Sequence, residues 1–295
     1  MRHILYILAL CLIVQNATAQ EQDSLQQTQR TLSIDEVVVT GSHIATDRRL
    51  LPMTISVLDR TEIESDNRPS LLPTLVEQVP GLFITSRGVM GYGVSTGASG
   101  GMSVRGVGGS PTTGVMVLID GHPQYMGLMG HPIADAYQSM IAERVEVVRG
   151  PASVLYGSNA MGGVINIITR KSAERGSHTD LRLGYGSYNT LEAEATNRTN
   201  LGRFTSTVTA SYNRSDGHRE NMDYEQMGGM ARLGYDLGRE WSISADLNIT
   251  HFNASNPGSI SSPIIDNDSR ITRGASSIAL RNAHGALSLF HNWGV

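Results

Sequence analysis

Two histidines and two methionines lie close together in the loop-like stretch from His122 to His131, with Met126 and Met129 between them. Imidazole and thioether groups suit copper or haem iron. The simpler interpretation is that the methionines pack a loop, against an aromatic or apolar ligand. We favour packing and keep metal or haem ligation by His122 and His131 as a weaker hypothesis.

Three short patterns resemble catalytic motifs but lack the context that the chemistry needs. Gly93–Gly97 and Gly97–Gly101 fit G-x-S-x-G, yet a nucleophile elbow needs a hydrophobic strand before the serine and a helix after it. Gly157–Gly162 has the spacing of a phosphate loop, but Gly163 and Val164 stand where lysine and serine or threonine are required. We therefore predict no enzymatic activity and no cofactor.

Residues 50–171 contain the elements of a small α+β domain. Asp59 can cap a short helix, with Thr61 and Glu64 at capping-box spacing, and Ser70–Gln78 reads as a second helix. Ile133–Met140 is also predicted to be helical. Strands are predicted at Thr54–Leu58, Leu82–Ser86, Met102–Val107 and Val115–Asp120, and two more within Arg144–Arg170.

The pattern changes to alternating polar and apolar residues after Lys171, which is typical of half-buried strands. About seven such strands are predicted, with short and long connections between them. They cover Leu181–Tyr185, Leu191–Thr196, Phe204–Tyr212, Met227–Leu237, Trp241–Thr250, Ser277–Leu280 and Leu287–Trp293. Small polar side chains on one face favour an antiparallel transmembrane β-barrel, with a soluble sandwich as the alternative.

The N-terminus predicts export. Residues 1–19 have a positive start, an apolar core and a small-residue cleavage site at Ala17–Ala19, as in a secretory signal peptide. The only cysteine, Cys11, lies in this segment, and lipoprotein processing there is the less favoured alternative. Residues 20–49 form a polar, flexible tether. The net charge of −4 gives no basic field for nucleic acid.

Four segments in order resemble the plug domain of TonB-dependent outer-membrane receptors. They read VEQVPGLFI, MSVRGVG, VMVLIDGHP and ERVEVVRGPASVLYGSNAMGGVINIITR. The resemblance implies an α+β plug at 50–171 followed by the N-terminal part of a β-barrel at 172–295. Barrels that enclose a plug have about 22 strands, so this sequence, with about seven, is expected to be a fragment or a truncated product.

The resemblance also implies roles for particular residues. The segment Asp35, Glu36, Val37, Val38, Val39 and Thr40 resembles the TonB box, which engages an inner-membrane energy transducer. A short strand of this kind can add to the edge of a partner's sheet, although it could equally be the first strand of its own domain. Arg105, Glu146 and Arg149 are expected to contact the barrel wall. The expected ligand-facing residues are Tyr92, His122, Tyr125, Met126, Met129 and His131.

The function that the resemblance implies is energy-dependent uptake of a large, scarce nutrient across the outer membrane. A ferric siderophore or another iron chelate is the first expectation, and haem, cobalamin or copper are alternatives within the family. The expected partners are a TonB-type transducer, outer-membrane lipid and an extracellular chelate. A binding or adhesion module that does not transport is the alternative from another class, and the plug argues against a passive porin.

Overall fold

The structure is a computed structural model of the 295-residue chain. It describes residues 37–38, 40, 46–47, 50–66, 68–85, 101–109, 114–124, 137–170, 175–238, 240–255, 257–264, 268–282 and 285–294. All of these belong to the compact unit that begins at Val37. The predicted signal peptide and most of the predicted tether lie outside the described residues.

A five-stranded sheet forms the centre of the N-terminal domain, in the order β3-β9-β10-β7-β8. Its strands are β3 (Ile55–Leu58), β7 (Val115–Ile119), β8 (His122–Pro123), β9 (Ala142–Arg149) and β10 (Gly163–Thr169). β10 runs antiparallel to β9 and parallel to β7. Runs of valine and isoleucine suit these central strands because both of their faces are covered.

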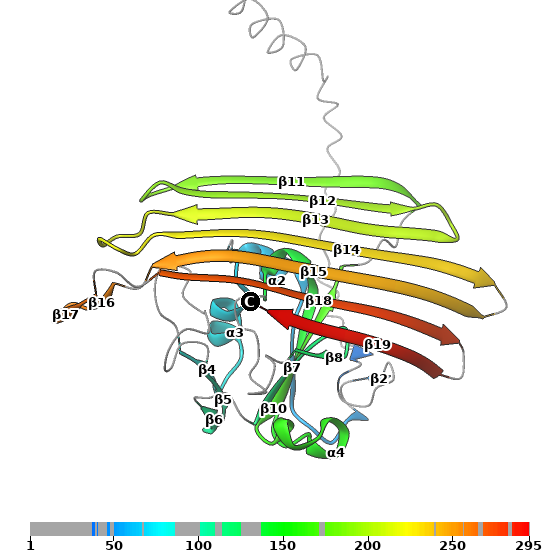
Figure 1. Ribbon diagram of the computed structural model, residues 1–295. Helices are drawn as coiled ribbons and strands as arrows, with labels where there is room; N and C mark the ends of the chain where they lie inside the picture. Colours follow the sequence, from blue (N-terminus) through cyan, green and yellow to red (C-terminus); the bar gives the residue numbers. More distant parts are fainter. Residues whose placement is uncertain are drawn as a thin grey trace, which may run out of the picture. The chain divides into compact units, whose positions relative to one another are not determined.

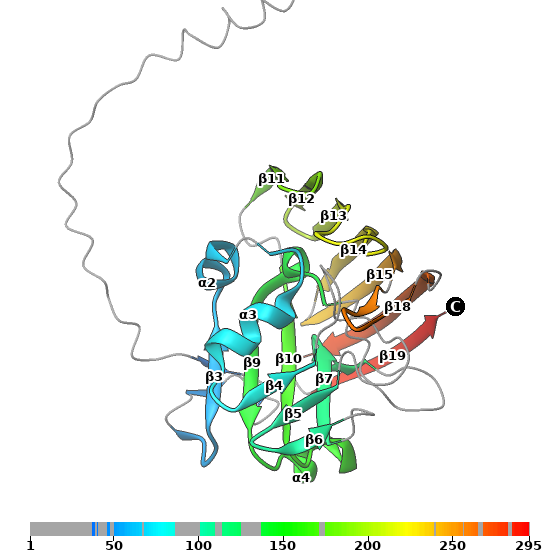
Figure 2. The ribbon, with the colours of Figure 1, turned by 90° about the vertical axis from the view of Figure 1, so that its left-hand side faces the viewer.

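Two helices cover one face of this sheet (Figure 2). They are α2 (Arg60–Ser65) and α3 (Leu71–Gln78), and α3 buries Leu71, Leu72 and Leu75 in the main core. The predicted helix Ser70–Gln78 is present, with Ser70 as its N-cap residue. The capping box of α2 joins Asp59 to Glu62, so the prediction that Thr61 and Glu64 form it was wrong.

The remaining small elements lie around the central sheet. A three-stranded sheet contains β4 (Leu82–Ile84), β5 (Met102–Val104) and β6 (Val107–Gly109), and a two-stranded sheet pairs β1 (Val37–Val38) with β2 (Thr46–Asp47). The turn between β9 and β10 carries α4 (Ser153–Tyr156). Of the helix predicted at Ile133–Met140, residues 133–136 lie outside the described residues, and Ser139–Ile141 forms a 3₁₀ turn.

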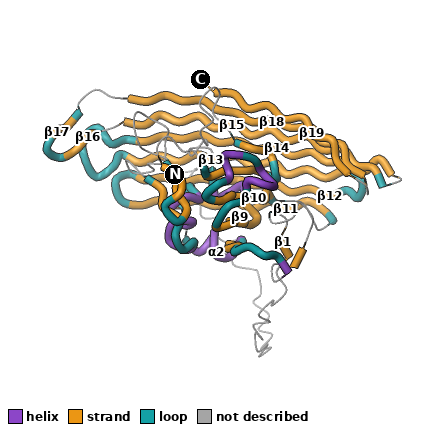
Figure 3. The backbone as a smooth tube through the Cα atoms, turned by 90° about the horizontal axis from the view of Figure 1, so that it is seen from below, coloured by secondary structure: helices purple, strands orange, loops and turns teal. Residues whose placement is uncertain are grey.

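Seven antiparallel strands form a second large sheet, here called the wall sheet (Figures 1 and 3). They are β11 (Gly176–Gly186), β12 (Thr190–Asn200), β13 (Phe204–Ser215), β14 (Tyr224–Gly238), β15 (Trp241–Ser255), β18 (Asp268–Asn282) and β19 (Gly285–Gly294). Each contains one of the seven predicted strands. A small hairpin of β16 (Gly258–Ser259) and β17 (Ser262–Pro263) lies between β15 and β18.

The two faces of the wall sheet differ in polarity. Along β15 the exposed residues include Trp241, Ile243, Leu247 and Ile249, whereas Thr250 is 1% exposed on the opposite face. The polar face is turned toward the N-terminal domain, and Figure 2 shows the strands in an arc beside that domain. This is the alternation expected when lipid covers one side of a sheet.

Among the described residues, no helix has the length and apolar character required to cross a membrane.

Candidate functional site

The N-terminal segment contacts the domain interior through Thr40. This residue is fully buried, and its backbone N–H and its hydroxyl both donate to Glu146 Oε2, at 2.8 and 2.5 Å. Asn166 Nδ2 donates to Thr40 Oγ1 at 3.0 Å, and the Tyr156 hydroxyl donates to the Thr40 carbonyl at 2.8 Å. Three polar groups of one residue are therefore bonded to three side chains.

The strand register explains why these side chains meet. Glu146 in β9 lies directly opposite Asn166 in β10, so both side chains project from the same face of the sheet. This is the face opposite the helices, where Val148 and Val164 form a smaller apolar cluster. Tyr156 reaches the same face from α4. Thr40 thus lies on the central strands and not on a peripheral loop.

The carboxylate of Glu146 is fully buried and needs compensation. Arg144 provides it, with Nε and Nη2 each 3.0 Å from Glu146 Oε1, while Thr40 bonds the other oxygen. Burial, together with the nearby charge of Glu146, raises the pKa of Tyr156 to about 12. Tyr156 therefore stays protonated, and remains a donor to Thr40, at any physiological pH.

A second polar cluster joins the N-terminal domain to the wall sheet. Asp120 follows β7, and Arg232 Nη1 on β14 lies 2.5 Å from its Oδ2. Thr169 donates to Asp120 from its backbone N–H at 3.1 Å and from its hydroxyl at 2.5 Å. On the wall side, Arg232 Nε lies 3.2 Å from Asp246 Oδ1, and Ser277 donates to Asp246 Oδ2 at 3.1 Å.

Gln138 makes another contact with the wall sheet. Its amide nitrogen donates to Thr250 at 3.3 Å, and its amide oxygen accepts from Ser211 at 3.0 Å. The contact requires glycine at position 228, because a Cβ there would lie 2.6 Å from Gln138 Nε2 and 2.7 Å from Ser211 Oγ. Small residues on this face therefore allow a close approach of the two parts.

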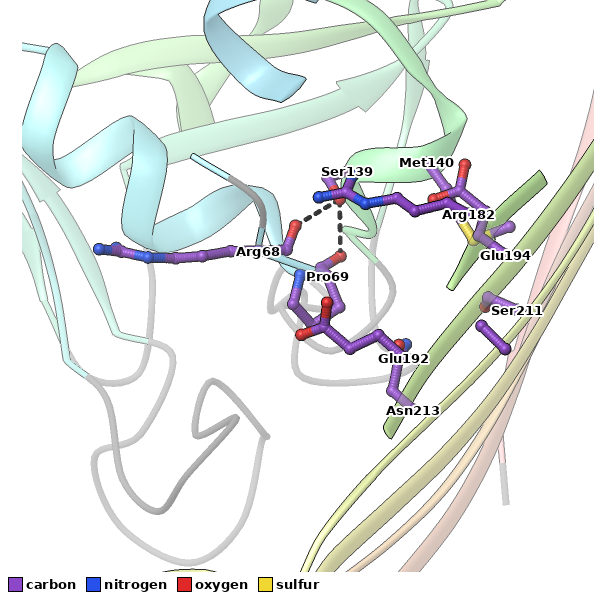
Figure 4. Close-up of a pocket in the computed structure, with 10 residues that line it drawn as sticks. Arg68, Pro69, Ser139, Met140, Arg182, Glu192, Glu194, Ser211 and Asn213 are labelled. Carbon is purple, nitrogen blue, oxygen red and sulfur yellow. Dashed lines mark hydrogen bonds between the residues drawn. The ribbon is translucent and has the colours of Figure 1, made fainter. Parts of the chain in front are cut away.

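A polar pocket lies between the N-terminal domain and strands β11–β13 (Figure 4). Arg68, Pro69 and Ser139 line one side, and Ser139 Oγ donates to the carbonyls of Arg68 and Pro69 at 2.5 and 3.2 Å. Arg182, Glu192 and Glu194 line the other side. The pocket carries both charge signs from one sheet, which favours water and ions over an apolar ligand.

Of the predicted ligand-facing residues, the structure describes His122 alone. Tyr92, Tyr125, Met126, Met129 and His131 lie outside the described residues. The ring centroid of His122 is 5.7 Å from that of Phe290 on β19, so this end of the loop faces the wall sheet. Burial lowers the pKa of His122 below 6.5 and outweighs the opposite effect of Asp120 and Asp246. Among the described residues, no group of three side chains could hold a metal ion.

The predicted wall contacts of Arg105, Glu146 and Arg149 stay predictions. The contacts described for these residues lie within the N-terminal domain. The backbone N–H of Arg105 donates to the Gly81 carbonyl at 2.7 Å, Arg149 Nη1 donates to the Pro80 carbonyl at 3.4 Å, and Glu146 bonds Thr40 and Arg144.

The predicted coupling segment is described in part. Val37 and Val38 form β1, which pairs with β2, and Thr40 is bound as above. Asp35, Glu36 and Val39 lie outside the described residues.

The sequence alone did not predict the contacts of Asp120, Gln138 and Arg232. A signal was present for Arg232, since a charged residue on the polar face of an alternating strand must meet a partner or water. Asp120 ends the predicted strand Val115–Asp120, and its role depends on a strand more than a hundred residues away.

Residues 47–164 match the family model described as the TonB-dependent Receptor Plug Domain. The iron-regulated outer membrane virulence protein of Vibrio cholerae is 35% identical over 170 residues, which are 55% of this chain and 23% of that protein. The rhizobactin receptor of Rhizobium meliloti is 34% identical over 171 residues, 57% of this chain and 21% of that protein. The chain therefore spans less than a quarter of the length of these relatives.

Solved structures show the same fold at low sequence identity. The alcaligin outer membrane receptor FauA of Bordetella pertussis has a TM-score of 0.68 and 18% identity, covering 88% of this chain and 42% of that chain. The siderophore receptor PiuA of Acinetobacter baumannii has a TM-score of 0.68 and 16% identity, covering 88% of this chain and 39% of that chain. The N-terminal domain and the wall sheet thus correspond to part of a known architecture.

Proposed function

We propose that the protein is an outer-membrane receptor, not an enzyme, that serves energy-coupled import of a ferric siderophore, because residues 47–164 match the plug-domain model of TonB-dependent receptors and the relatives are named as an outer membrane protein and a receptor. The predicted export signal at residues 1–19 belongs to the same proposal. One observation carries it. The N-terminal segment is bonded to the central strands of the plug at Thr40, while another part of the same sheet is bonded to the wall.

This arrangement supports coupling by a pulled segment. β1 belongs to a two-stranded sheet, and an edge strand of this kind can pair with a strand from a partner. A TonB-type transducer that bound here would pull on Thr40 and hence on Glu146 and Asn166. Several contacts between plug and wall are hydrogen bonds and ion pairs, and such contacts can exchange with water as the plug shifts.

An iron chelate is the substrate class that the relatives favour. One relative is named for iron regulation and the other as a rhizobactin receptor. The candidate ligand-facing residues remain Tyr92, Tyr125, Met126, Met129 and His131, together with His122. Replacing His122 and His131 by alanine tests the alternative ligands: a loss of haem or copper binding would support ligation by these histidines, and unchanged affinity would exclude it.

The test separates binding from uptake in cells that express the full-length receptor gene. Catecholate, hydroxamate and carboxylate siderophores loaded with radioactive iron are supplied with and without a protonophore. We expect binding in both conditions and accumulation only with the proton gradient. Deleting residues 35–38 should abolish accumulation and leave binding, whereas deleting residues 24–27 of the tether is the matched control.

Two results would overturn the proposal. Accumulation that survives both the protonophore and the deletion of residues 35–38 would indicate passive entry. Binding with no accumulation under any condition would indicate a binding module that does not transport. Competition by haem, cobalamin or copper, but by no siderophore, would keep the transport class and replace the substrate.

A further inference from the structure

The contacts of Thr40 define a binding site for one residue of the N-terminal segment, formed by Glu146, Tyr156 and Asn166 and here called the Thr40 site. We propose that the Thr40 site positions the coupling segment on the plug, and that Asn166 links this position to the contact between plug and wall. The role in coupling rests on the proposed function, whereas the existence of the site does not.

The chemistry of the site selects threonine or serine. The hydroxyl donates to Glu146 at 2.5 Å and accepts from Asn166 at 3.0 Å, so it needs both a proton and a lone pair. Valine has the same shape and provides neither. The bonds to Glu146 are charge-assisted, which makes them shorter and stronger than bonds between neutral groups.

The backbone of Thr40 is held as well as its side chain. The N–H donates to Glu146 at 2.8 Å, and the carbonyl accepts from Tyr156 at 2.8 Å. A segment in incidental contact with the domain would not have its backbone N–H, its backbone carbonyl and its side chain hydrogen-bonded at the same time. If Thr40 leaves, the buried Glu146 carboxylate loses two donors, and this cost favours the bound position.

Asn166 connects the site to the wall contact. Its Oδ1 accepts from the backbone N–H of Gly121 at 3.2 Å, while its Nδ2 holds Thr40. Gly121 follows Asp120 directly, and Asp120 binds Arg232 of the wall sheet. One amide therefore joins the coupling segment to the turn that carries the plug–wall ion pair. A shift of this turn should therefore change the strength with which Thr40 is bound. Release of Thr40 should in the same way affect the position of the turn.

Site-directed spin labelling of the receptor in isolated outer membranes tests the inference. A nitroxide is placed at Val38→Cys in a receptor whose other mature cysteines, if present, are replaced by serine, so that the protein carries a single label. We expect an immobile spectrum with Thr40 present. Thr40→Val should increase the ratio of mobile to immobile label about tenfold or more, since two side-chain bonds to buried partners are lost. Thr40→Ser should restore the immobile spectrum.

Two further pairs of variants, each a substitution and its control, test the roles of Tyr156 and Glu146. Tyr156→Phe should also mobilise the label, whereas Tyr188→Phe, at an exposed tyrosine of the β11–β12 turn, should not. Glu146→Gln should act like Tyr156→Phe, with Glu77→Gln on the exposed side of α3 as its control. Thermal unfolding of each variant shows whether the plug stays folded. An equally immobile label in Thr40→Val and Tyr156→Phe would overturn the Thr40 site.

A separate pair of variants tests the link between the Thr40 site and the wall sheet. Arg232→Met should mobilise the label severalfold without touching Thr40, and Arg281→Met, on the same face of the wall, should not. A label unmoved by Arg232→Met would refute the link through Asn166. These spectra need neither siderophore nor transducer, so they can fail while uptake succeeds. Variants in which the label is mobile but siderophore uptake is unchanged would refute the role of the Thr40 site in coupling.

Discussion

The ion pair of Asp120 with Arg232 should contribute measurably to the attachment of the plug to the wall. Each side chain is 11% exposed, so solvent screens the pair only in part. Removing one partner of a buried pair costs about 3–5 kcal/mol. Here Asp120 keeps its bonds from Thr169, and Asp246 keeps its bond from Ser277. We therefore expect Arg232→Met to destabilise the folded plug by the lower value, about 3 kcal/mol.

Plug opening can be measured through a buried cysteine. Val147 is 0% exposed at the centre of β9, so the thiol of Val147→Cys should react with iodoacetamide only when the plug opens. Reaction rates across a urea series give the free energy of opening. A loss of about 3 kcal/mol raises the opening equilibrium roughly a hundredfold. Combining Arg232→Met with Asp120→Asn should show a coupling energy of about 1–3 kcal/mol.

Arg281→Met is the matched control. Arg281 lies on the same face of the wall sheet and donates to Ser244 of that sheet at 2.9 Å. Its replacement should change the opening free energy by less than about 0.5 kcal/mol. The reasoning would be refuted if Arg232→Met changed the opening free energy as little as Arg281→Met, or if the double mutant showed no coupling.

Three other variants test separate features of the structure. Leu247→Arg places a charge on the exposed apolar face of β15 and should lower barrel stability by about 2–4 kcal/mol, seen as less protease-resistant protein in the membrane, with Leu247→Ala as the control. Gly228→Ala should push Gln138 from the wall and weaken plug attachment by about 1–3 kcal/mol, whereas Gly229→Ala, whose Cβ would meet its nearest atom at 3.9 Å, should be tolerated. Because burial lowers the pKa of His122, the imidazole of His122 binds its second proton more weakly in the folded plug than in the unfolded chain. Plug stability should therefore fall as the pH drops below about 6.5, a dependence that His122→Gln should reduce and that would be contradicted by equal slopes in both proteins.

Most elements of the fold could be predicted because they depend on local sequence, although the single strand predicted at Met102–Val107 is two strands, β5 and β6, joined by a turn at Arg105 and Gly106. Alternation over Trp241–Thr250 marks a strand wherever its partners lie, and Ser70 caps a helix through bonds within one turn. The error at Thr61 and Glu64 has a local cause too. Asp59 and Glu62 have the same spacing and begin the helix earlier. Sequence spacing alone cannot choose between two overlapping boxes.

The contacts that join the plug to the wall sheet and to the N-terminal segment could not be predicted in the same way. Alternation places Arg232 on the polar face of its strand, but it does not say which plug residue faces that position. Glu146 shows the difference most clearly. Its place on a strand follows from the sequence pattern, whereas its bonds to Thr40 require a segment more than a hundred residues earlier to cross the sheet. Such pairings depend on topology, which a single sequence does not contain.

The strand order of the plug has a mechanical consequence. In the order β3-β9-β10-β7-β8, the first strand in sequence occupies one edge, and the turn after β7 at the other side carries the ion pair with the wall. β3 is held by four residue pairs, from Ile55 with Val148 to Leu58 with Val145. Once Thr40 has been released from Glu146 and Asn166, tension applied ahead of Ile55 loads β3 before any other strand of this sheet. The plug should unfold from β3 toward β7. The strands that are still folded then stay attached to the wall sheet through Asp120.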